Sequence, residues 1–187
     1  MKTRTDDEIT READQLLASR EAFIGQWGAM GGAWGINRTM AQIHALLLTS
    51  VEPMTTDEIM TELKISRGNA NTNLRDLVGW GLIRSLFKKG DRKEYFEAET
   101  DIWKMFCIIA RERKRREIEP AVRTLRQCIS ETRELDSMEA QRFKEVTQDL
   151  EDFITRGELL LDKLVEAPQG SILPKLLQAL SKPRRSS

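Results

Sequence analysis

The sequence predicts a mainly α-helical protein with one β-hairpin near the middle of the chain. Apolar residues recur every three or four positions over most of its length, and residues that cap helices precede several of these stretches. Two short runs on either side of a glycine turn have the length and composition of strands. The 187 residues are 40% hydrophobic and 32% charged, which is typical of a folded chain and excludes a disordered one.

The N-terminal segment, residues 1–36, is expected to form a helix followed by a glycine loop. Apolar side chains from Ile9 to Trp27 follow a helical spacing. Four glycines between Gly28 and Gly35 then interrupt the pattern, and each costs a helix about 1 kcal/mol relative to alanine. We therefore expect the helix to break at Gly28.

Three helices are predicted next, from residue 37 onward. Each is preceded by a residue of a type that caps helices and contains apolar positions at helical spacing. The capping residues are Asn37, Thr55 or Thr56, and Ser66. The third helix ends near Gly79. Its inward positions are predicted to be Ala70, Leu74, Leu77 and Val78.

Two strands follow these helices. Residues 82–87 and 94–98 flank a turn with Gly90 and Asp91 at its tip. The order of three helices, strand, turn and strand within residues 37–98 is that of a winged helix-turn-helix with a two-stranded wing.

The remainder of the chain, residues 99–167, is predicted to be helical. Its last long helix repeats apolar residues in steps of three and four, which is the spacing of a coiled-coil seam or of a core. These residues are Phe143, Val146, Leu150, Phe153, Gly157, Leu160 and Leu164. Residues 168–187 are predicted to be a short helix and a basic tail.

Basic residues gather in one segment, although the 30 Lys and Arg residues of the chain equal its 30 Asp and Glu residues. Between Lys64 and Lys93, eight basic residues accompany only two acids, Asp76 and Asp91. Such an island is expected of a surface that binds an anion such as DNA, although a solvated surface shows it too. The balanced total excludes a uniformly basic nucleic-acid coat.

The outward face of the helix after Ser66 carries side chains that can read bases. In a helix-turn-helix the second helix enters the major groove with its N-terminal residues at the base edges. Arginine can bond guanine, asparagine can bond adenine, and a threonine methyl can contact thymine. The alternative is a polar surface helix, but such helices favour Glu, Lys and Gln. The candidate base contacts are Arg67, Gly68, Asn69, Asn71 and Thr72.

The predicted wing is basic and follows that helix. A basic hairpin can track the phosphate backbone or insert an arginine into a narrow minor groove. A charged edge that prevents strand aggregation is the alternative. The candidate phosphate or wing contacts are Arg75, Lys88, Lys89, Arg92 and Lys93, with Arg92 as the candidate for the minor groove.

Five motifs resemble the GbsR branch of the MarR-type transcriptional regulators. They are FIGQWG (23–28), GINR (35–38), SRGNANTNLRDL (66–77), GLI (81–83) and GDRKEY (90–95). The resemblance covers roughly residues 15–120 and implies a winged-helix dimer, usually a repressor, on a palindromic operator. It also implies that the C-terminal helices form the dimer interface, and that Asp91 and Arg92 are the Asp/Arg pair of the family's wing. We therefore expect the winged helix-turn-helix to be flanked by N-terminal and C-terminal dimerisation helices.

We therefore expect a cytoplasmic, sequence-specific DNA-binding regulator that acts as a homodimer on double-stranded DNA and is no enzyme. The alternative is a winged helix that docks a protein partner and binds no DNA. The N-terminus lacks the apolar segment of a secretion signal. The longest apolar run, residues 45–48, is too short to span a membrane.

Three of the four tryptophans raise the question of a small-molecule effector. Trp27, Trp34 and Trp103 are candidates for a pocket, because aromatic faces attract quaternary ammonium groups and characterised relatives in the GbsR branch sense choline. The alternative is that these tryptophans are large core residues.

Metal and catalytic chemistry find little support in the sequence. His44, the single histidine, lies in an apolar stretch and is expected as a hydrogen-bonded helix residue rather than a ligand. Cys107 and Cys128 form no zinc-binding pattern, and Cys107 is expected to be buried and unreactive. No cofactor, metal site or catalytic residue is predicted.

Overall fold

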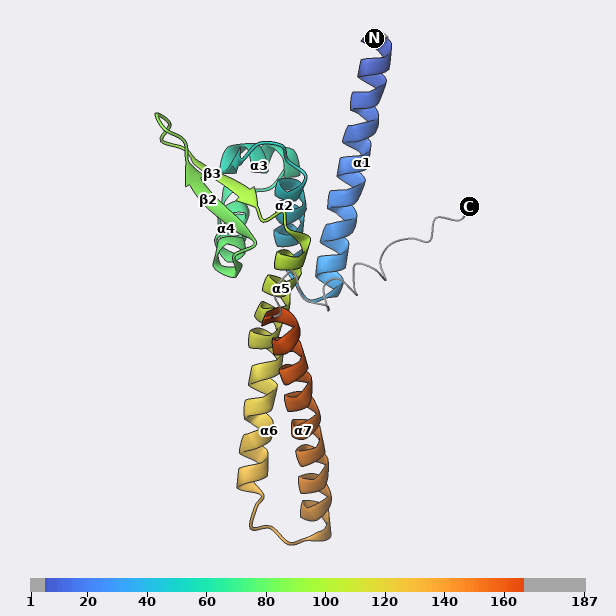
Figure 1. The fold of residues 1–187 in the computed structure, drawn as a ribbon, viewed down its shortest axis with the longest axis vertical. Coiled ribbons are helices and arrows are strands. Elements are labelled where there is room, and N and C mark those ends of the chain that lie inside the picture. Colours follow the sequence, from blue (N-terminus) through green and yellow to red (C-terminus); the bar gives the residue numbers. More distant parts are fainter. Residues whose placement is uncertain (1–5, 167–187) are drawn as a thin grey trace, which may run out of the picture. The chain divides into compact units, whose positions relative to one another are not determined.

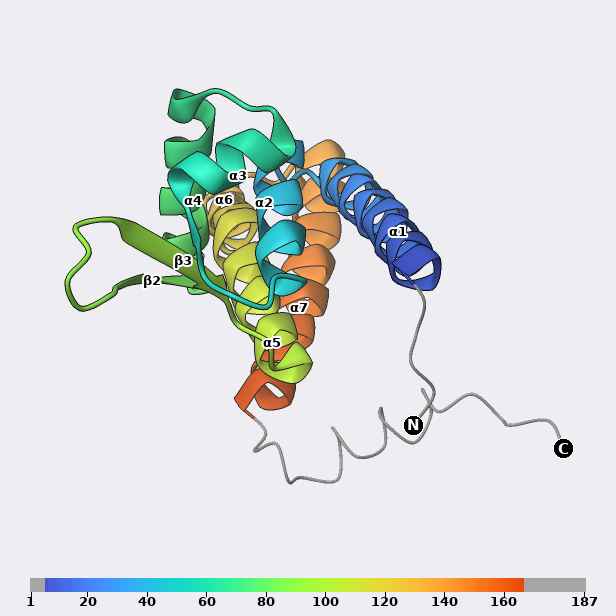
Figure 2. The same ribbon diagram turned by 90° about the horizontal axis from the view of Figure 1, so that it is seen from above.

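The computed structural model describes residues 6–166, which fall into two compact units (Figures 1 and 2). The first unit ends at Asp101 and contains the predicted winged helix-turn-helix, and the second begins at Ile102 and is built from helices. The predicted short helix and basic tail, residues 168–187, lie outside the described residues. Within the described part of the chain, no helix has the length and hydropathy needed to cross a bilayer.

Helix α1 (Asp6–Ala33) is longer than its glycine content predicts. It continues through Gly28, Gly31 and Gly32, so the predicted glycine loop is wrong. Gly35, with a φ of 76°, lies in the short turn that follows the helix. Helix propensity is a weak preference that tertiary packing overrides, and α1 shows such a case.

The packing in question is that of α1 against α2 (Arg38–Leu48), which lies beside it in both views (Figures 1 and 2). A Cβ atom added at Gly31 would lie 2.6 Å from Cβ of Ala41, and one at Gly28 would lie 2.5 Å from Cγ of Gln42. Both distances are too short for a side chain. The two glycines therefore permit the helices to approach closely.

Helices α2, α3 (Thr56–Leu63) and α4 (Arg67–Trp80) begin where their capping residues predict. The side chains of Asn37, Thr55 and Ser66 each accept a backbone N–H from the first turn of the helix that follows. These helices enclose the core of the first unit. Its most deeply buried large side chains are Ile43, Leu46, Ile59, Leu74 and Leu77.

His44 lies in this core with an exposed fraction of 3%. Its Nε2 has no hydrogen-bond partner among residues 6–166, contrary to the expectation of a hydrogen-bonded ring. The centre of the ring lies 6.2 Å from that of Trp27. Burial lowers the pKa of His44 from 6.5 to about 4, so the ring is uncharged at neutral pH.

The sheet of the first unit has three antiparallel strands in the order β1-β3-β2. Strands β2 (Ile83–Phe87) and β3 (Glu94–Ala98) pair along their whole length and form the predicted wing. Strand β1 (Met54–Thr55) pairs with β3, with Met54 opposite Phe96. A strand of two residues is too short to produce a periodic pattern, so the sequence does not predict it.

The second unit contains α5 (Ile102–Arg113), a π-helical turn (Lys114–Ile118), α6 (Glu119–Glu131) and α7 (Met138–Glu166). The prediction of a helical C-terminal region is confirmed. Pro120 accounts for the π-helical turn, because proline offers no N–H to the preceding turn and its ring displaces the carbonyl there. Helices α6 and α7 run antiparallel and side by side (Figure 1).

Ion pairs connect α7 to the π-helical turn and to α6. Nζ of Lys114 lies 2.7 Å from Oδ2 of Asp162, and Nε of Arg126 lies 2.7 Å from Oε1 of Glu151. Cys107 is buried, as predicted, whereas Cys128 is half-buried.

The heptad positions of α7 do not form the core of the second unit. Phe153 is 77% exposed and Leu160 is 69% exposed. The other large exposed members of the series are Phe143, Val146 and Leu150. Of the two interpretations of this spacing, an internal core is therefore wrong, and a seam with another helix stays a prediction.

Candidate nucleic-acid interface

Helix α4 separates a buried side from an exposed polar face. Ala70, Leu74 and Leu77 are buried, as predicted, but Val78 is 39% exposed and the buried Asn73 lies on the inner side. A helix turns about 100° per residue, so the position three residues after Ala70 faces the core as closely as the position four residues after it. The residues predicted to face outward are all exposed: Arg67, Gly68, Asn69, Asn71, Thr72 and Arg75.

Asn73 holds the side chain of Asn69 from within the helix. Its Nδ2 donates to the backbone oxygen of Asn69 at 2.8 Å and to Oδ1 of the same residue at 2.7 Å. Asn69 donates from Nδ2 to Oγ1 of Thr39, which lies 3.4 Å away on α2. A carboxamide oxygen accepts two hydrogen bonds and its nitrogen donates two, so Asn69 keeps one of each for a base. Asn73 was not among the predicted site residues, although its spacing from Ala70 and Leu77 places it on the buried side.

Arg67 is the first residue of α4 and is bound to α3. Its Nη2 donates to Oδ1 of Asp57, which lies in the first turn of α3. The two side chains remain 61% and 65% exposed. The bond to Asp57 therefore orients the side chain of Arg67, the candidate for a guanine contact, at the surface.

The turn of the wing is organised by Asp91. Gly90 has a φ of 86°, which the turn requires, and Asp91 follows it. Oδ1 of Asp91 accepts the backbone N–H of Lys93 at 2.9 Å, and Oδ2 accepts the hydroxyl of Tyr95 at 2.7 Å. The bond from Lys93, followed by that from Tyr95, lowers the pKa of Asp91, and the bond to Asp91 raises the pKa of Tyr95. Nζ of Lys88 lies 4.4 Å from the centre of the Tyr95 ring.

The basic side chains of the wing are accessible. Lys88, Lys89, Arg92 and Lys93 are all exposed. Their predicted contacts with phosphate and with the minor groove stay predictions. Tyr95 was not among the predicted site residues, because its bond to Asp91 forms only when the turn closes.

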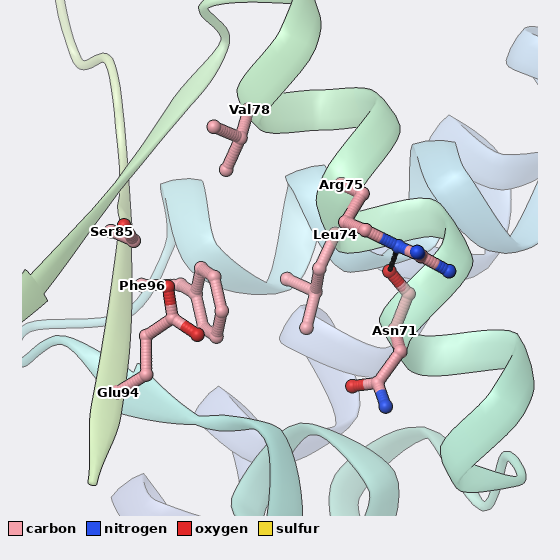
Figure 3. Close-up of a pocket in the computed structure, with 7 residues that line it drawn as sticks. All are labelled: Asn71, Leu74, Arg75, Val78, Ser85, Glu94 and Phe96. Atoms are coloured by element: carbon pink, nitrogen blue, oxygen red, sulfur yellow. Dashed lines mark hydrogen bonds between the residues drawn. The ribbon is translucent and has the colours of Figure 1, made fainter. Parts of the chain in front are cut away.

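A hollow of about 480 Å³ lies between α4 and the wing (Figure 3). Leu74 and Phe96 face each other across it, while Glu94 lies on the strand side (Figure 3). On the helix side, Nε of Arg75 donates to the backbone oxygen of Asn71 at 3.3 Å. Residues of α4, among them Asn71 and Arg75, and residues of β2 and β3 therefore line one concave surface.

The tryptophans of the predicted effector pocket belong to both units. Trp27 packs against Phe23, with 5.5 Å between ring centres, and Trp34 is 52% exposed. Trp103 belongs to the second unit and stacks on Phe106 with 5.5 Å between ring centres. The pocket itself stays a prediction.

Residues 34–94 match the family model of the MarR family. Over this segment the chain is similar to the MarR family. The MarR segment begins before α2 and ends at the first residue of β3, so it includes every candidate contact from Arg67 to Lys93.

Curated MarR-type relatives match only part of the chain. The chain is 26% identical over 110 residues to the HTH-type transcriptional repressor GbsR of Bacillus subtilis (strain 168). This alignment covers 59% of this chain and 61% of the relative. The chain is 31% identical over 86 residues to the HTH-type transcriptional regulator MmpR5 of Mycobacterium tuberculosis (strain ATCC 25618 / H37Rv), which covers 44% of this chain and 52% of the relative. The chain thus spans between 52% and 61% of the length of these relatives.

A solved structure shares the fold of this chain. A crystal structure of a transcriptional regulator aligns with a TM-score of 0.59 at 24% identity, over 79% of this chain and 95% of its own. Together with the family match, these similarities confirm the resemblance that the sequence motifs predict.

Proposed function

We propose that this chain is a MarR-type transcriptional regulator that binds duplex DNA sequence-specifically through α4 and the wing. The exposed row of base-reading side chains on α4, beside a basic wing, carries the proposal. The N-terminal turns of α4 enter the major groove, where Arg67 bonds guanine and Asn69 and Asn71 bond adenine. Thr72 contacts a thymine methyl, and Gly68 allows the backbone to approach the bases.

The basic residues supply the affinity that does not depend on sequence. Arg75, Lys88, Lys89 and Lys93 neutralise phosphates, and Arg92 enters the minor groove beside the recognition site. Each neutralised phosphate releases counterions, so binding weakens steeply as salt concentration rises.

The regulator acts as a homodimer on a palindromic operator. The exposed apolar face of α7, which includes Phe153 and Leu160, supports this step, because large exposed apolar patches mark interaction surfaces. A two-fold axis repeats α4 about 34 Å away, which is one turn of DNA, so the two half-sites are inverted repeats. Repression is proposed because the relative GbsR is a repressor.

Light scattering tests the dimer. We expect the mass of two chains for the wild type and of one chain for Phe153→Glu, which places a charge in the apolar face of α7. Gln148→Glu adds the same charge at another exposed position of α7 and should leave the dimer intact. A dimer that survives Phe153→Glu would assign the interface to a different surface.

A small-molecule effector tunes operator binding in this proposal. Trp27, Trp34 and Trp103 are its candidate residues, with a quaternary ammonium ligand as the expected chemical class. Calorimetric titration with choline and with betaine tests this class directly. Flat heats at millimolar ligand would reject it.

Selection of bound duplexes from a random-oligonucleotide pool tests the main proposal. We expect an inverted repeat whose half-site centres are one helical turn apart. Binding to the selected site should then weaken by about a thousandfold or more between 50 and 200 mM salt, as expected for roughly six or more phosphate contacts. Weak, salt-insensitive binding without a selected sequence would refute DNA recognition.

A further inference from the structure

Asp57 is an acidic residue that the capping of α3 does not use. Thr55 and Glu58 close the capping box, in which Oε2 of Glu58 accepts the backbone N–H of Thr55 at 2.7 Å and its hydroxyl at 2.8 Å. The carboxylate of Asp57 instead accepts from Nη2 of Arg67. The two neighbouring acids at the start of α3 therefore have different partners.

The contact between Asp57 and Arg67 matters for orientation more than for stability. Both side chains are more than half exposed, and ion pairs in that environment add little to folding free energy. A long arginine side chain, however, loses rotamer freedom when it binds a base, and a partner that holds it beforehand reduces this loss. The guanidinium has five N–H donors, so enough remain for the two acceptors of guanine.

We propose that Asp57 is a specificity-determining residue that positions Arg67 for guanine without contacting DNA itself. The proposal rests on the proposed function and deepens it. When a base pair lacks the paired acceptors of guanine, Arg67 can reach another acceptor only by leaving Asp57, which would leave that carboxylate unpaired beside the DNA. Discrimination then arises both from the correct contact and from a penalty on the incorrect one.

Asp57→Asn tests the proposal against Glu62→Gln, which removes the same charge from an exposed position on the same helix. The measurement is a competition between two duplexes. One is the selected operator. In the other, A·T replaces the G·C pair that wild-type protein selects and the Arg67→Ala variant does not. We expect Asp57→Asn to reduce the preference for the operator by about three- to tenfold, as expected from freeing one long side chain. Glu62→Gln should retain the preference, and both variants should bind random duplex alike.

A second background separates the positioning role from other effects. In Arg67→Ala, the further change Asp57→Asn should leave the preference unchanged, because the residue that it positions is absent. An undiminished preference in the single variant Asp57→Asn, or an equal loss in the Arg67→Ala background, would overturn the inference while leaving DNA binding intact. A wild-type chain that selects no sequence would instead overturn the proposed function and this inference with it.

Discussion

Acid should destabilise the first unit through His44, by an amount that its burial sets. The ring packs beside Trp27, and burial lowers its pKa from 6.5 to about 4. In the unfolded chain the ring takes up a proton near its ordinary pKa, so unfolding becomes more favourable as pH falls from 6.5 to about 4. One pKa unit corresponds to about 1.4 kcal/mol, so roughly 3 kcal/mol of unfolding free energy is lost over this window. Below the folded pKa the ring is protonated in both states, and its contribution stops changing.

His44→Leu is the variant that measures this loss, because leucine has no titratable group. Carboxylates also titrate in acid, so the quantity to follow is the difference in unfolding free energy between variant and wild type. Urea denaturation, followed by tryptophan fluorescence at constant protein concentration, supplies it at each pH. We expect the difference to be constant above about pH 7 and to shift by roughly 3 kcal/mol in favour of the variant near pH 4. A difference that stays flat over the whole range would refute the buried, uncharged ring.

Three further predictions follow from the packing and from the proposed interface. Gly31→Ala should cost about 1–3 kcal/mol, because its Cβ would lie 2.6 Å from Cβ of Ala41. Gly32→Ala, with nothing within 4 Å of its Cβ, should gain up to about 1 kcal/mol, and urea titrations that show the same sign for both would contradict the close approach of α1 and α2. Arg67→Ala should cost roughly 1–3 kcal/mol at the preferred site and relax specificity there. Equal losses on all duplexes in a competition assay would assign Arg67 to phosphate instead. Lys89→Ala should weaken binding alike on all sequences and reduce the salt slope by about one, and an unchanged slope would remove Lys89 from the phosphate contacts.

The local signals in the sequence predict the elements of the first unit well. Asn37, Thr55 and Ser66 cap helices because their side chains bond N–H groups two or three residues away, and such contacts are visible in sequence. Gly28 and Gly31 mislead because their role depends on α2, which a propensity scale does not include. The same scale would end α1 at Trp27, whereas the helix continues to Ala33.

In the candidate interface too, local features could be predicted from the sequence, whereas contacts that depend on tertiary structure could not. The exposed face of α4 follows from helical periodicity, so Arg67 and Asn69 were predicted to face outward. The bond from Arg67 to Asp57 joins residues on two helices, and that from Tyr95 to Asp91 depends on how the wing closes. Neither contact produces a periodic pattern in the sequence. The supporting roles of Asp57 and Tyr95 are therefore visible only in the folded structure.

Thr55 connects the wing directly to the start of α3. It pairs with Tyr95 in the sheet, while its N–H and hydroxyl bond the carboxylate of Glu58 at the start of α3. Tyr95 in turn bonds Asp91 at the far end of the wing. Lifting the wing away from β1 therefore strains the first turn of α3, where Asp57 is located. In the proposed complex, a DNA duplex too wide or too bent for the wing is therefore penalised at the bases as well as at the backbone, which couples recognition of operator shape to recognition of operator sequence.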